Sequence, residues 1–195
     1  MPLIAELKTA QTDAPILDVL AERWSPRAYT AEPIDEAKLA SALEAARWSA
    51  SGGNSQPWRF IVARRGSAAF DKIASTLAPF NAVWAPAASV LLVGLYTELR
   101  DQSGNLRNTV FYDLGQAMAH LSVQAHHDGL HVHQMTGFDP AALAEAFGLP
   151  AEVKPFVVAT IGTVGSPDDL DAALAERERQ PRTRLARDQI VLVDE

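Results

Sequence analysis

The chain has 195 residues, 48% of them hydrophobic, which is enough to bury one sizeable core. Its 24 Asp and Glu residues outnumber the 17 Lys and Arg residues, and the net charge of −7 argues against a nucleic-acid-binding surface. The absence of Cys excludes disulfides, thiolate metal sites and a Cys nucleophile. The longest apolar run, residues 86–96, is shorter than the ~20 residues that span a bilayer, and residues 1–13 lack the pattern of a secretory signal. We therefore expect a cytoplasmic protein that binds neither nucleic acid nor membrane.

The first half of the chain predicts helices and strands in irregular alternation. In chain order the expected elements are a helix at 13–24, a helix at 35–48, a strand at 58–64, a helix at 67–77 and a strand at 88–96. Leu39, Ala42 and Leu43 form one apolar stripe of the second helix, and Asp13 is placed to cap the first. The strand at 88–96 is apolar on both faces, which is typical of a central, buried strand.

The second half continues with a long helix and further strands. The expected elements are a helix at 108–127, a strand at 131–136, a helix at 139–149, a strand at 156–165 and a short final strand at 190–193. The long helix carries so much apolar surface that we expect it at the centre of the core or in a dimer interface. The final strand has no evident partner. The pattern predicts one α+β domain over residues 1–195, in which residues 1–12 form a flexible extension.

Self-contained catalytic motifs are absent from the sequence. Zinc-protease, nucleophile-elbow, dinucleotide and phosphate-loop patterns are all missing. His131 and His133 alternate on one strand face, but no carboxylate stands at ligand spacing beside them. We therefore interpret the histidines as structural or solvent-exposed and predict no metal site. If the chain is an enzyme, a cofactor performs its chemistry.

Three separated clusters offer hydrogen-bond donors to a small anion. Residues 23–27 (RWSPR) place two Arg around a Ser, and residues 182–184 (RTR) present two alternating Arg side chains. The loop at 49–54 (SASGGN) carries N–H and hydroxyl donors without bulk. Alternatively, the loop is an ordinary flexible turn and the tail arginines pair with acidic residues beside them. The order of the three clusters favours a common site.

In this order the clusters resemble the sequence pattern of the nitroreductase family of FMN-dependent oxidoreductases. The resemblance rests on R-x-S-x-R followed by Tyr29, on the segment ASGGNSQPWRF, on TGFDPAALAEAFGLP, and on the basic tail RTRLARDQIVL. It covers residues 14–193. The resemblance implies a nitroreductase-like α+β fold, with a central mixed or antiparallel sheet flanked by helices. It also implies an intertwined homodimer that exchanges its C-terminal strand.

The resemblance implies cofactor-binding roles for residues of every cluster, namely Arg23, Trp24, Ser25, Arg27, Ser51, Gly52, Asn54, Asn81, Thr136, Gly137, Arg182 and Arg184. The RWSPR residues would contact the phosphate, ribityl chain and pyrimidine edge of FMN, Trp24 through its backbone. The loop residues would come from the partner subunit. The Asn81 amide would meet the polar part of the ring, and Thr136 and Gly137 would lie along the ring with a backbone N–H directed at N5. The two tail arginines would close on the phosphate.

The resemblance further implies the reaction. The homodimer would bind FMN at its interface and take a hydride from NADH or NADPH. It would reduce a small organic acceptor, such as a nitroaromatic, a quinone or an enal-like compound, by a ping-pong mechanism. The flavin N5 would carry the hydride, so no catalytic side chain is assigned. Two alternatives stay open: a flavin-binding storage or sensing protein with little turnover, and a helical scaffold dimer that binds no flavin.

The sequence departs from the family pattern at three places. Ala50-Ser51-Gly52 stands where Pro-Ser-Ser is frequent, and Thr136 stands where Glu is frequent. The insertion before the long helix is shortened to residues 97–107. Because that insertion helps to shape access for the acceptor, the resemblance does not identify the substrate.

Overall fold

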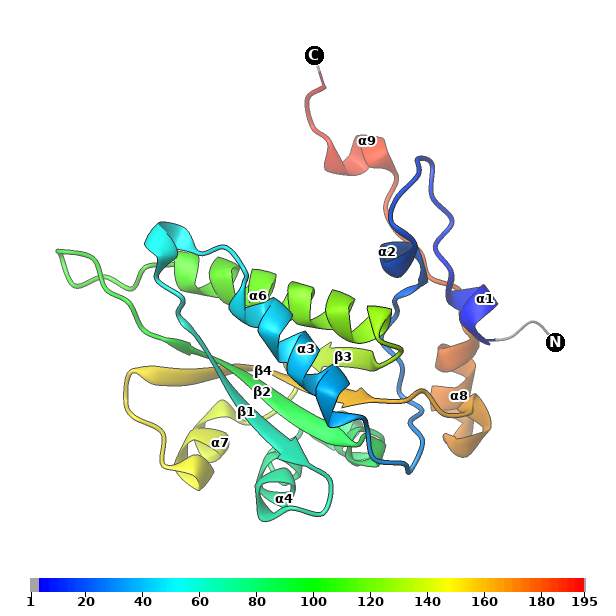
Figure 1. The fold of residues 1–195 in the computed structure, drawn as a ribbon, viewed down its shortest axis with the longest axis horizontal. Helices are drawn as coiled ribbons and strands as arrows, with labels where there is room; N and C mark the ends of the chain where they lie inside the picture. The colour runs from blue at the N-terminus through cyan, green and yellow to red at the C-terminus, as the bar shows by residue number, and fades with distance from the viewer. Residues whose placement is uncertain (1–3, 195) are drawn as a thin grey trace.

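Four antiparallel strands form the centre of the computed structural model, which describes residues 4–194 (Figure 1). The strands are β1 Trp58–Arg64, β2 Val90–Thr97, β3 His131–Met135 and β4 Val153–Gly162. They lie in the order β1-β2-β4-β3, and each neighbouring pair is antiparallel. The predicted α+β class with an antiparallel central sheet is therefore confirmed.

Helices cover both faces of this sheet (Figure 1). The α-helices are α1 Ile4–Lys8, α2 Asp18–Glu22, α3 Glu36–Arg47, α4 Ala68–Ala74, α5 Pro79–Ala82, α6 Thr109–His127, α7 Pro140–Phe147, α8 Ala172–Arg179 and α9 Arg187–Ile190. Three 3-10 turns complete the elements: η1 Gly52–Asn54, η2 Ala85–Ala87 and η3 Pro167–Asp169. The Asp35 carboxylate accepts from the Ala37 N–H, and the Asp139 carboxylate accepts from the N–H groups of Ala141 and Ala142. These caps fix the starts of α3 and α7 where the sequence predicts them.

The sheet separates two apolar cores. On one face, α3 and α6 bury Leu39, Leu114 and Leu121 against the sheet. On the other face, α4 and α7 bury Ile73 and Leu143. Strand β2 lies between both cores, and its residues 90–95 are all buried. The prediction of a central strand that is apolar on both faces is therefore confirmed.

The first predicted helix is shorter than expected. Helix α2 begins at Asp18, after Leu17 as its N-cap, and not near Asp13. Pro15 disfavours helical backbone in the residue before it. Ile16 and Leu17 are 46% and 70% exposed, so no core holds their side chains on a helical face. Both effects remove the reason for a helix before residue 18.

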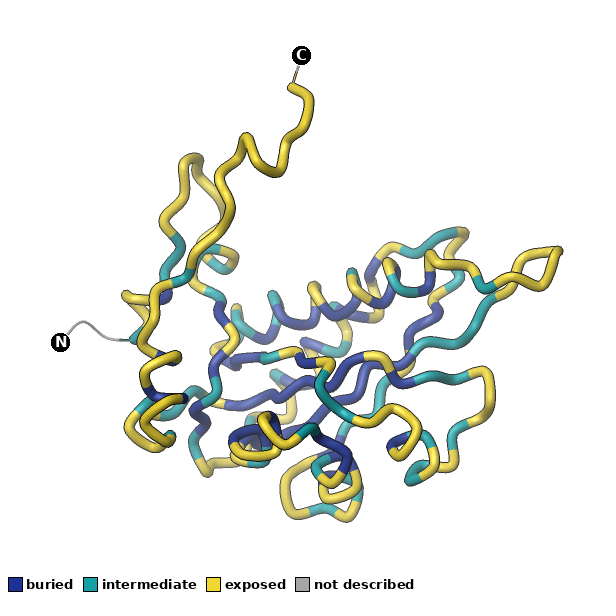
Figure 2. The backbone as a smooth tube through the Cα atoms, turned by 180° about the vertical axis from the view of Figure 1, so that it is seen from behind, coloured by how far each residue is buried: buried dark blue, intermediate teal, exposed yellow. Residues whose placement is uncertain are grey.

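The predicted final strand is absent from the single chain. Residues Arg187–Ile190 form the short helix α9, and Leu192 and Val193 follow it with 90% and 73% exposed. A strand needs a neighbour for its backbone N–H and C=O groups, and no strand within residues 4–194 pairs with this segment. Figure 2 shows that the terminal arms (residues 4–22 and 180–194) extend from the body as largely exposed segments.

The two terminal arms contact each other. Lys8 is buried, and its Nζ donates to the Gln180 carbonyl at 2.7 Å. Burial lowers the pKa of Lys8. Arg182 Nη1 donates to the carbonyls of Ala21 at 2.6 Å and Lys8 at 3.1 Å. The single domain and the flexible extension over residues 1–12 stay predictions, and the first three of those residues lie outside the described part of the chain.

Within residues 4–194, no helix is long and apolar enough to cross a membrane.

Candidate functional site

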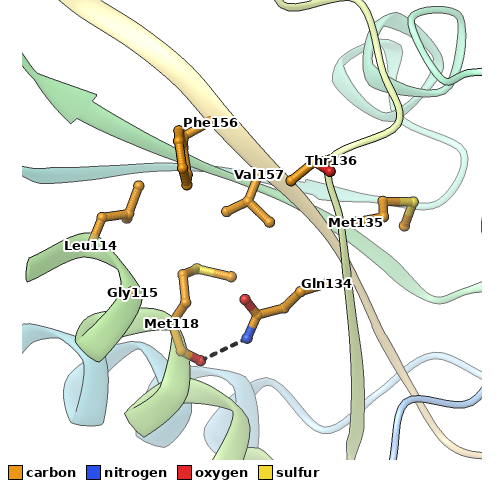
Figure 3. Close-up of a pocket in the computed structure, with 8 residues that line it drawn as sticks. All are labelled: Leu114, Gly115, Met118, Gln134, Met135, Thr136, Phe156 and Val157. Atoms are coloured by element: carbon orange, nitrogen blue, oxygen red, sulfur yellow. Dashed lines mark hydrogen bonds between the residues drawn. The ribbon is translucent and has the colours of Figure 1, made fainter. Parts of the chain in front are cut away.

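Two neighbouring cavities form a groove between α6 and β3. The Phe156 cavity has a volume of about 360 Å³ (Figure 3), and its lining consists of Leu114, Gly115, Met118, Gln134, Met135, Thr136, Phe156 and Val157. The Arg23 cavity has a volume of about 330 Å³, and its lining consists of Leu20, Arg23, Ser25, Ala119, Ser122, Val123, Val132 and Gln134. Gln134 lines both cavities, so the two adjoin at this side chain.

A glycine and a bulge shape the floor of the Phe156 cavity. A Cβ at Gly94 would lie 2.7 Å from Val157 Cγ1 and 3.1 Å from Met118 Sδ, so only glycine lets these side chains pack here. The register shifts between Gly94 and Leu95, which leaves Phe156 without a partner on β2. Bulges of this kind re-aim a side chain. The Phe156 ring lies 5.3 Å from that of Phe111 and stands at the rim of the cavity (Figure 3).

Gly115 leaves one wall of the same cavity flat. It lies in the interior of the 19-residue helix α6, where glycine costs ~1 kcal/mol relative to Ala. A Cβ built on Gly115 would meet nothing within 4 Å, so it would project into open space beside the cavity. The missing side chain therefore provides room for a flat group against α6. Sequence reasoning missed Gly115, although a glycine inside a strongly helical pattern is a usable signal.

Positive charge gathers at the Arg23 cavity. Burial lowers the pKa of both Arg23 and Arg182, and neighbouring guanidinium groups, including that of Arg184, lower it further. Within residues 4–194, none of these three arginines forms an ion pair with a carboxylate. The structure thus brings together one arginine of RWSPR and both arginines of RTR. A cationic cluster without acidic partners is suited to a phosphate dianion.

Arg27 lies apart from that cluster. Its backbone N–H donates to Glu178 Oε2 at 3.2 Å, and its guanidinium lies 3.9 Å from the same oxygen. Burial lowers the pKa of Arg27, and Glu178 opposes this shift. Trp24 Nε1 donates to Glu178 Oε1 at 3.4 Å. Glu178 is 1% exposed, so this buried carboxylate on α8 anchors the RWSPR segment. The sequence pattern offered Glu178 only as one of the acidic partners of the tail arginines, in the alternative interpretation, and indicated no such role.

Asn81 holds the segment that follows β3. Its Nδ2 donates to the Gly137 carbonyl at 2.9 Å, and a Cβ on Gly137 would lie 2.7 Å from this nitrogen. Thr136, the residue between Gly137 and β3, lines the Phe156 cavity. The Arg27 guanidinium lies 5.9 Å from the centre of the Phe80 ring, next to Asn81 in sequence. Asn81, Thr136 and Gly137 are therefore gathered beyond the C-terminal end of β3, and Arg27 lies beside the neighbouring Phe80 ring.

The loop containing Ser51, Gly52 and Asn54 lies at the start of α6. The Gly52 N–H donates to the buried carboxylate of Asp113, at 3.2 Å to Oδ1 and 3.3 Å to Oδ2. Ser51 Oγ and Asn54 Oδ1 each accept from Gln56, at 3.0 Å. The Arg23 cavity lies against the second half of α6, so the helix separates this loop from the arginines of its own chain. Asp113 carried no signal of this anchoring role in the sequence.

The histidines of β3 pack against aromatic rings. His131 lies 4.4 Å from Trp24 and 5.0 Å from His126 between ring centres, and burial lowers the pKa of His131 to about 4. His133 lies 4.5 Å from Trp84, and burial lowers its pKa to about 4 as well. In the part of the chain that the structure describes, no group of three His, Asp or Glu side chains is arranged to hold a metal ion. The absence of a metal stays a prediction.

Comparisons with known proteins place the chain in a family. The sequence matches the Nitroreductase family over residues 20–82 and 74–165. An uncharacterized 15.4 kDa protein of Mycolicibacterium smegmatis is 40% identical over 139 residues, covering 68% of this chain and 92% of that protein. A NADH dehydrogenase of Thermus thermophilus is 27% identical, covering 91% of this chain and 97% of that one. The crystal structure of an oxidoreductase containing FMN matches with a TM-score of 0.86 at 33% identity, over 93% of this chain and 92% of that chain. The chain has the nitroreductase fold and belongs to the nitroreductase family.

Proposed function

We propose that the protein is an FMN-dependent oxidoreductase that takes reducing equivalents from NADH or NADPH and passes them to a small organic acceptor. The observation that carries this proposal is the groove along α6 and β3. It is cationic at the Arg23 cavity and apolar, with one flat wall at Gly115, at the Phe156 cavity. FMN fits both ends of this groove, because it has a phosphate dianion at one end, which suits the cationic cavity, and a planar ring at the other, which suits the apolar cavity.

Different residues of the groove would bind different parts of FMN. Arg23, Arg182 and Arg184 would hold the phosphate, together with the Ser25 hydroxyl. The ring would lie beside Gly115 in the apolar cavity, where the absence of a side chain leaves room. The remaining predicted contacts, those of Trp24, Arg27, Asn81, Thr136 and Gly137, would meet the ribityl chain, the polar ring and N5.

The chemistry that bound FMN supplies is hydride acceptance and donation at its N5. The chain's own residues bind and orient the ring so that one face stays open to donor and acceptor in turn, which gives ping-pong kinetics. Phe156, 42% exposed at the cavity rim, would limit water at the apolar end. Small planar acceptors, such as nitroaromatics, quinones and enal-like compounds, match this apolar surface. The names of two relatives, an oxidoreductase containing FMN and a NADH dehydrogenase, support the cofactor and the donor class.

A homodimer would complete the site. Ser51, Gly52 and Asn54 lie at the other end of α6 from the arginines, so we propose that they contact the FMN of the partner subunit. Tyr112 of α6 and Leu192 of the tail are 70% and 90% exposed, which supports burial against a second copy. The C-terminal segment would then form its strand by exchange between subunits.

Spectroscopy and rapid kinetics test the proposal. Purified protein, supplied with FMN, should show the visible spectrum of bound oxidised flavin, and anaerobic mixing with NADH or NADPH in a stopped-flow instrument should bleach it. Bleaching within seconds, followed by recovery on adding menadione, would support the oxidoreductase. A flavin spectrum that stays oxidised with both donors would instead favour a storage or sensing protein. A protein that binds no FMN would contradict the proposal and favour a scaffold dimer.

A further inference from the structure

Gln134 occupies the one point where the two cavities of the groove meet. It lies on β3, next to the strand's last residue, and its side chain lines both the Arg23 cavity and the Phe156 cavity. No sequence motif includes Gln134. A polar side chain at the junction of a cationic and an apolar cavity must contact whatever part of a ligand connects the two.

The hydrogen bonds around Gln134 fix the orientation of its amide. Ser122 Oγ donates its only proton to the Met118 carbonyl at 2.8 Å, so it can only accept from Gln134. Gln134 Nε2 donates to Ser122 Oγ at 2.9 Å and to the Met118 carbonyl at 3.2 Å. The NH2 group of the amide is therefore held against α6, and Oε1 is directed into the groove (Figure 3).

Oε1 is a hydrogen-bond acceptor that is available to a ligand. Within residues 4–194 the bonds of the Gln134 amide all run through Nε2, and the side chain is exposed to the groove. A carbonyl oxygen binds donors such as hydroxyl or N–H groups and repels phosphate oxygens and ring carbonyls, which can only accept. The junction thus selects a ligand segment that carries hydroxyl donors.

We propose that Gln134 binds the ribityl chain of FMN, with Oε1 accepting from a ribityl hydroxyl. This assignment rests on the proposed function, which places the phosphate at Arg23 and the ring at Gly115. The ribityl chain connects those two groups and carries three hydroxyls, so it crosses the junction. Ser122 acts as a positioning residue, because it holds the amide in the orientation that presents Oε1. A ribityl contact at this point also fixes how far along the groove the ring lies.

Three flavins that differ in one group each test the assignment. FMN has ring, ribityl chain and phosphate; riboflavin lacks the phosphate; lumiflavin has the ring without the ribityl chain. Each is titrated into flavin-free protein by fluorescence quenching, for wild type, Gln134→Leu and Ser122→Ala. Gln124→Leu is the matched control, because Gln124 lies on the same helix as Ser122 and its amide bonds Asp128 instead of facing the groove. Thermal melting of each variant reports whether it is folded.

Gln134→Leu should raise the dissociation constants of FMN and riboflavin by roughly three- to tenfold, as expected for one neutral hydrogen bond, and leave that of lumiflavin unchanged. Ser122→Ala should shift these dissociation constants in the same direction by a smaller factor, because the amide loses one of the two hydrogen bonds that orient it. This variant carries the test if Gln134→Leu does not fold. Equal weakening of lumiflavin would overturn the proposal by showing that Gln134 acts on the ring or on the fold. Unchanged binding of all three flavins would also overturn it. Wild-type protein that binds none of them contradicts the proposed function itself, which is a separate outcome.

Discussion

The sheet body and the terminal arms differ in where their apolar side chains find partners. In the body, Trp84, Leu92 and Leu121 are buried by other residues of the same chain. In the arms, Leu17 and Leu192 are 70% and 90% exposed, although they are just as apolar. Contiguous apolar surface on a segment without its own core is typical of an interface. One chain therefore completes the body, whereas the arms leave apolar side chains that the proposed homodimer would bury.

The groove spans both regions. Its apolar end is built from α6, β3 and β4 of the body, which are held by two cores. Its cationic end includes Arg182, whose guanidinium is held by carbonyls of the N-terminal arm. In the proposed function, the ring half of FMN would meet a preformed surface, whereas the phosphate half would depend on how the arms are held.

The largest effect should follow from removing the C-terminal arm. Deletion of residues 187–195 removes Leu192 and Val193 together with the predicted exchanged strand, so we expect the dimer to become a monomer in sedimentation velocity at micromolar concentration. The circular dichroism spectrum of the body should stay the same, because residues 187–194 contribute no buried side chain. A truncated protein that remains dimeric would show that the C-terminal arm is not what holds the two subunits together.

The sequence predicted the body well because its signals are local. The stripes of α3 and α6 and the continuous apolar run of β2 report burial within the chain, and each lies where periodicity predicts it. The prediction of a final strand at 190–193 was wrong for the opposite reason. Ile190 and its neighbours have the composition of a strand, but a strand also needs a neighbour, and composition does not say where that neighbour is.

The candidate site divides in the same way. Arginines and glycines in RWSPR, SASGGN and RTR carry a chemical signal of their own, so residue type alone marked them. Glu178, Asp113 and Gln134 act through partners distant in sequence: Glu178 meets Trp24 across 154 positions, and Asp113 meets Gly52 across 61. In the sequence, a single acidic residue in a charged tail or a single Gln on a strand is typical of an exposed surface position. Only the folded structure shows which distant residue it contacts.

Acid should weaken the packing of residues 24–26, which follow the N-terminal arm, against the body. His131 packs against Trp24, and His133 Nδ1 donates to the Pro26 carbonyl at 2.9 Å. Burial lowers both histidine pKa values to about 4 from an ordinary value of 6.5. The folded state thus binds fewer protons than the unfolded state between these values, so stability is complete above pH 6.5 and is lost as pH falls toward 4. Each histidine contributes at most roughly 3 kcal/mol to this loss.

Chemical denaturation at pH 7 and at pH 4.5 measures this effect. His131→Phe should reduce the difference in unfolding free energy between the two pH values, because the substituted ring does not titrate. His127→Gln, a change at an exposed histidine of α6, is the control and should leave the difference as in wild type. If His131→Phe shows the full wild-type difference, the junction of arm and body is not the acid-sensitive element.

FMN binding should depend on single guanidinium groups, both in the cationic cluster (Arg184) and apart from it (Arg27). Arg184→Ala and Arg27→Ala each remove a charged hydrogen-bond donor, a contribution of ~1.5–3 kcal/mol, and should raise the FMN dissociation constant by roughly ten- to a hundredfold. Arg→Lys should rescue these variants only in part, because an ammonium does not fork onto two oxygens. Arg179→Ala is the control, since Arg179 pairs with Asp168. Arg177 is unsuitable as a second control, because it lies over the same Phe80 ring as Arg27.

Riboflavin binding distinguishes the role of Arg184 from that of Arg27. It lacks the phosphate, so its binding should be unaffected by Arg184→Ala and weakened by Arg27→Ala, if Arg27 meets the ring. The measurement is titration by fluorescence quenching at one salt concentration, because phosphate contacts are screened by salt. If Arg179→Ala and Arg184→Ala weaken FMN binding equally, only net charge matters, and the site assignment is wrong.

The smallest effect concerns Asp113, and it decides which subunit each loop serves. Asp113→Ala removes the acceptor of the Gly52 N–H and should weaken FMN binding by roughly three- to tenfold through a less ordered loop. In a mixed dimer of an Asp113→Ala chain with an Arg184→Ala chain, a loop that serves the partner places both defects in one site and leaves the other site intact. Half of the sites should then bind FMN with the wild-type constant. If the loop serves its own chain, each site carries one defect and no site binds with the wild-type constant. Tagged mixed dimers, purified and titrated with FMN, distinguish these two patterns by the presence or absence of the tight half.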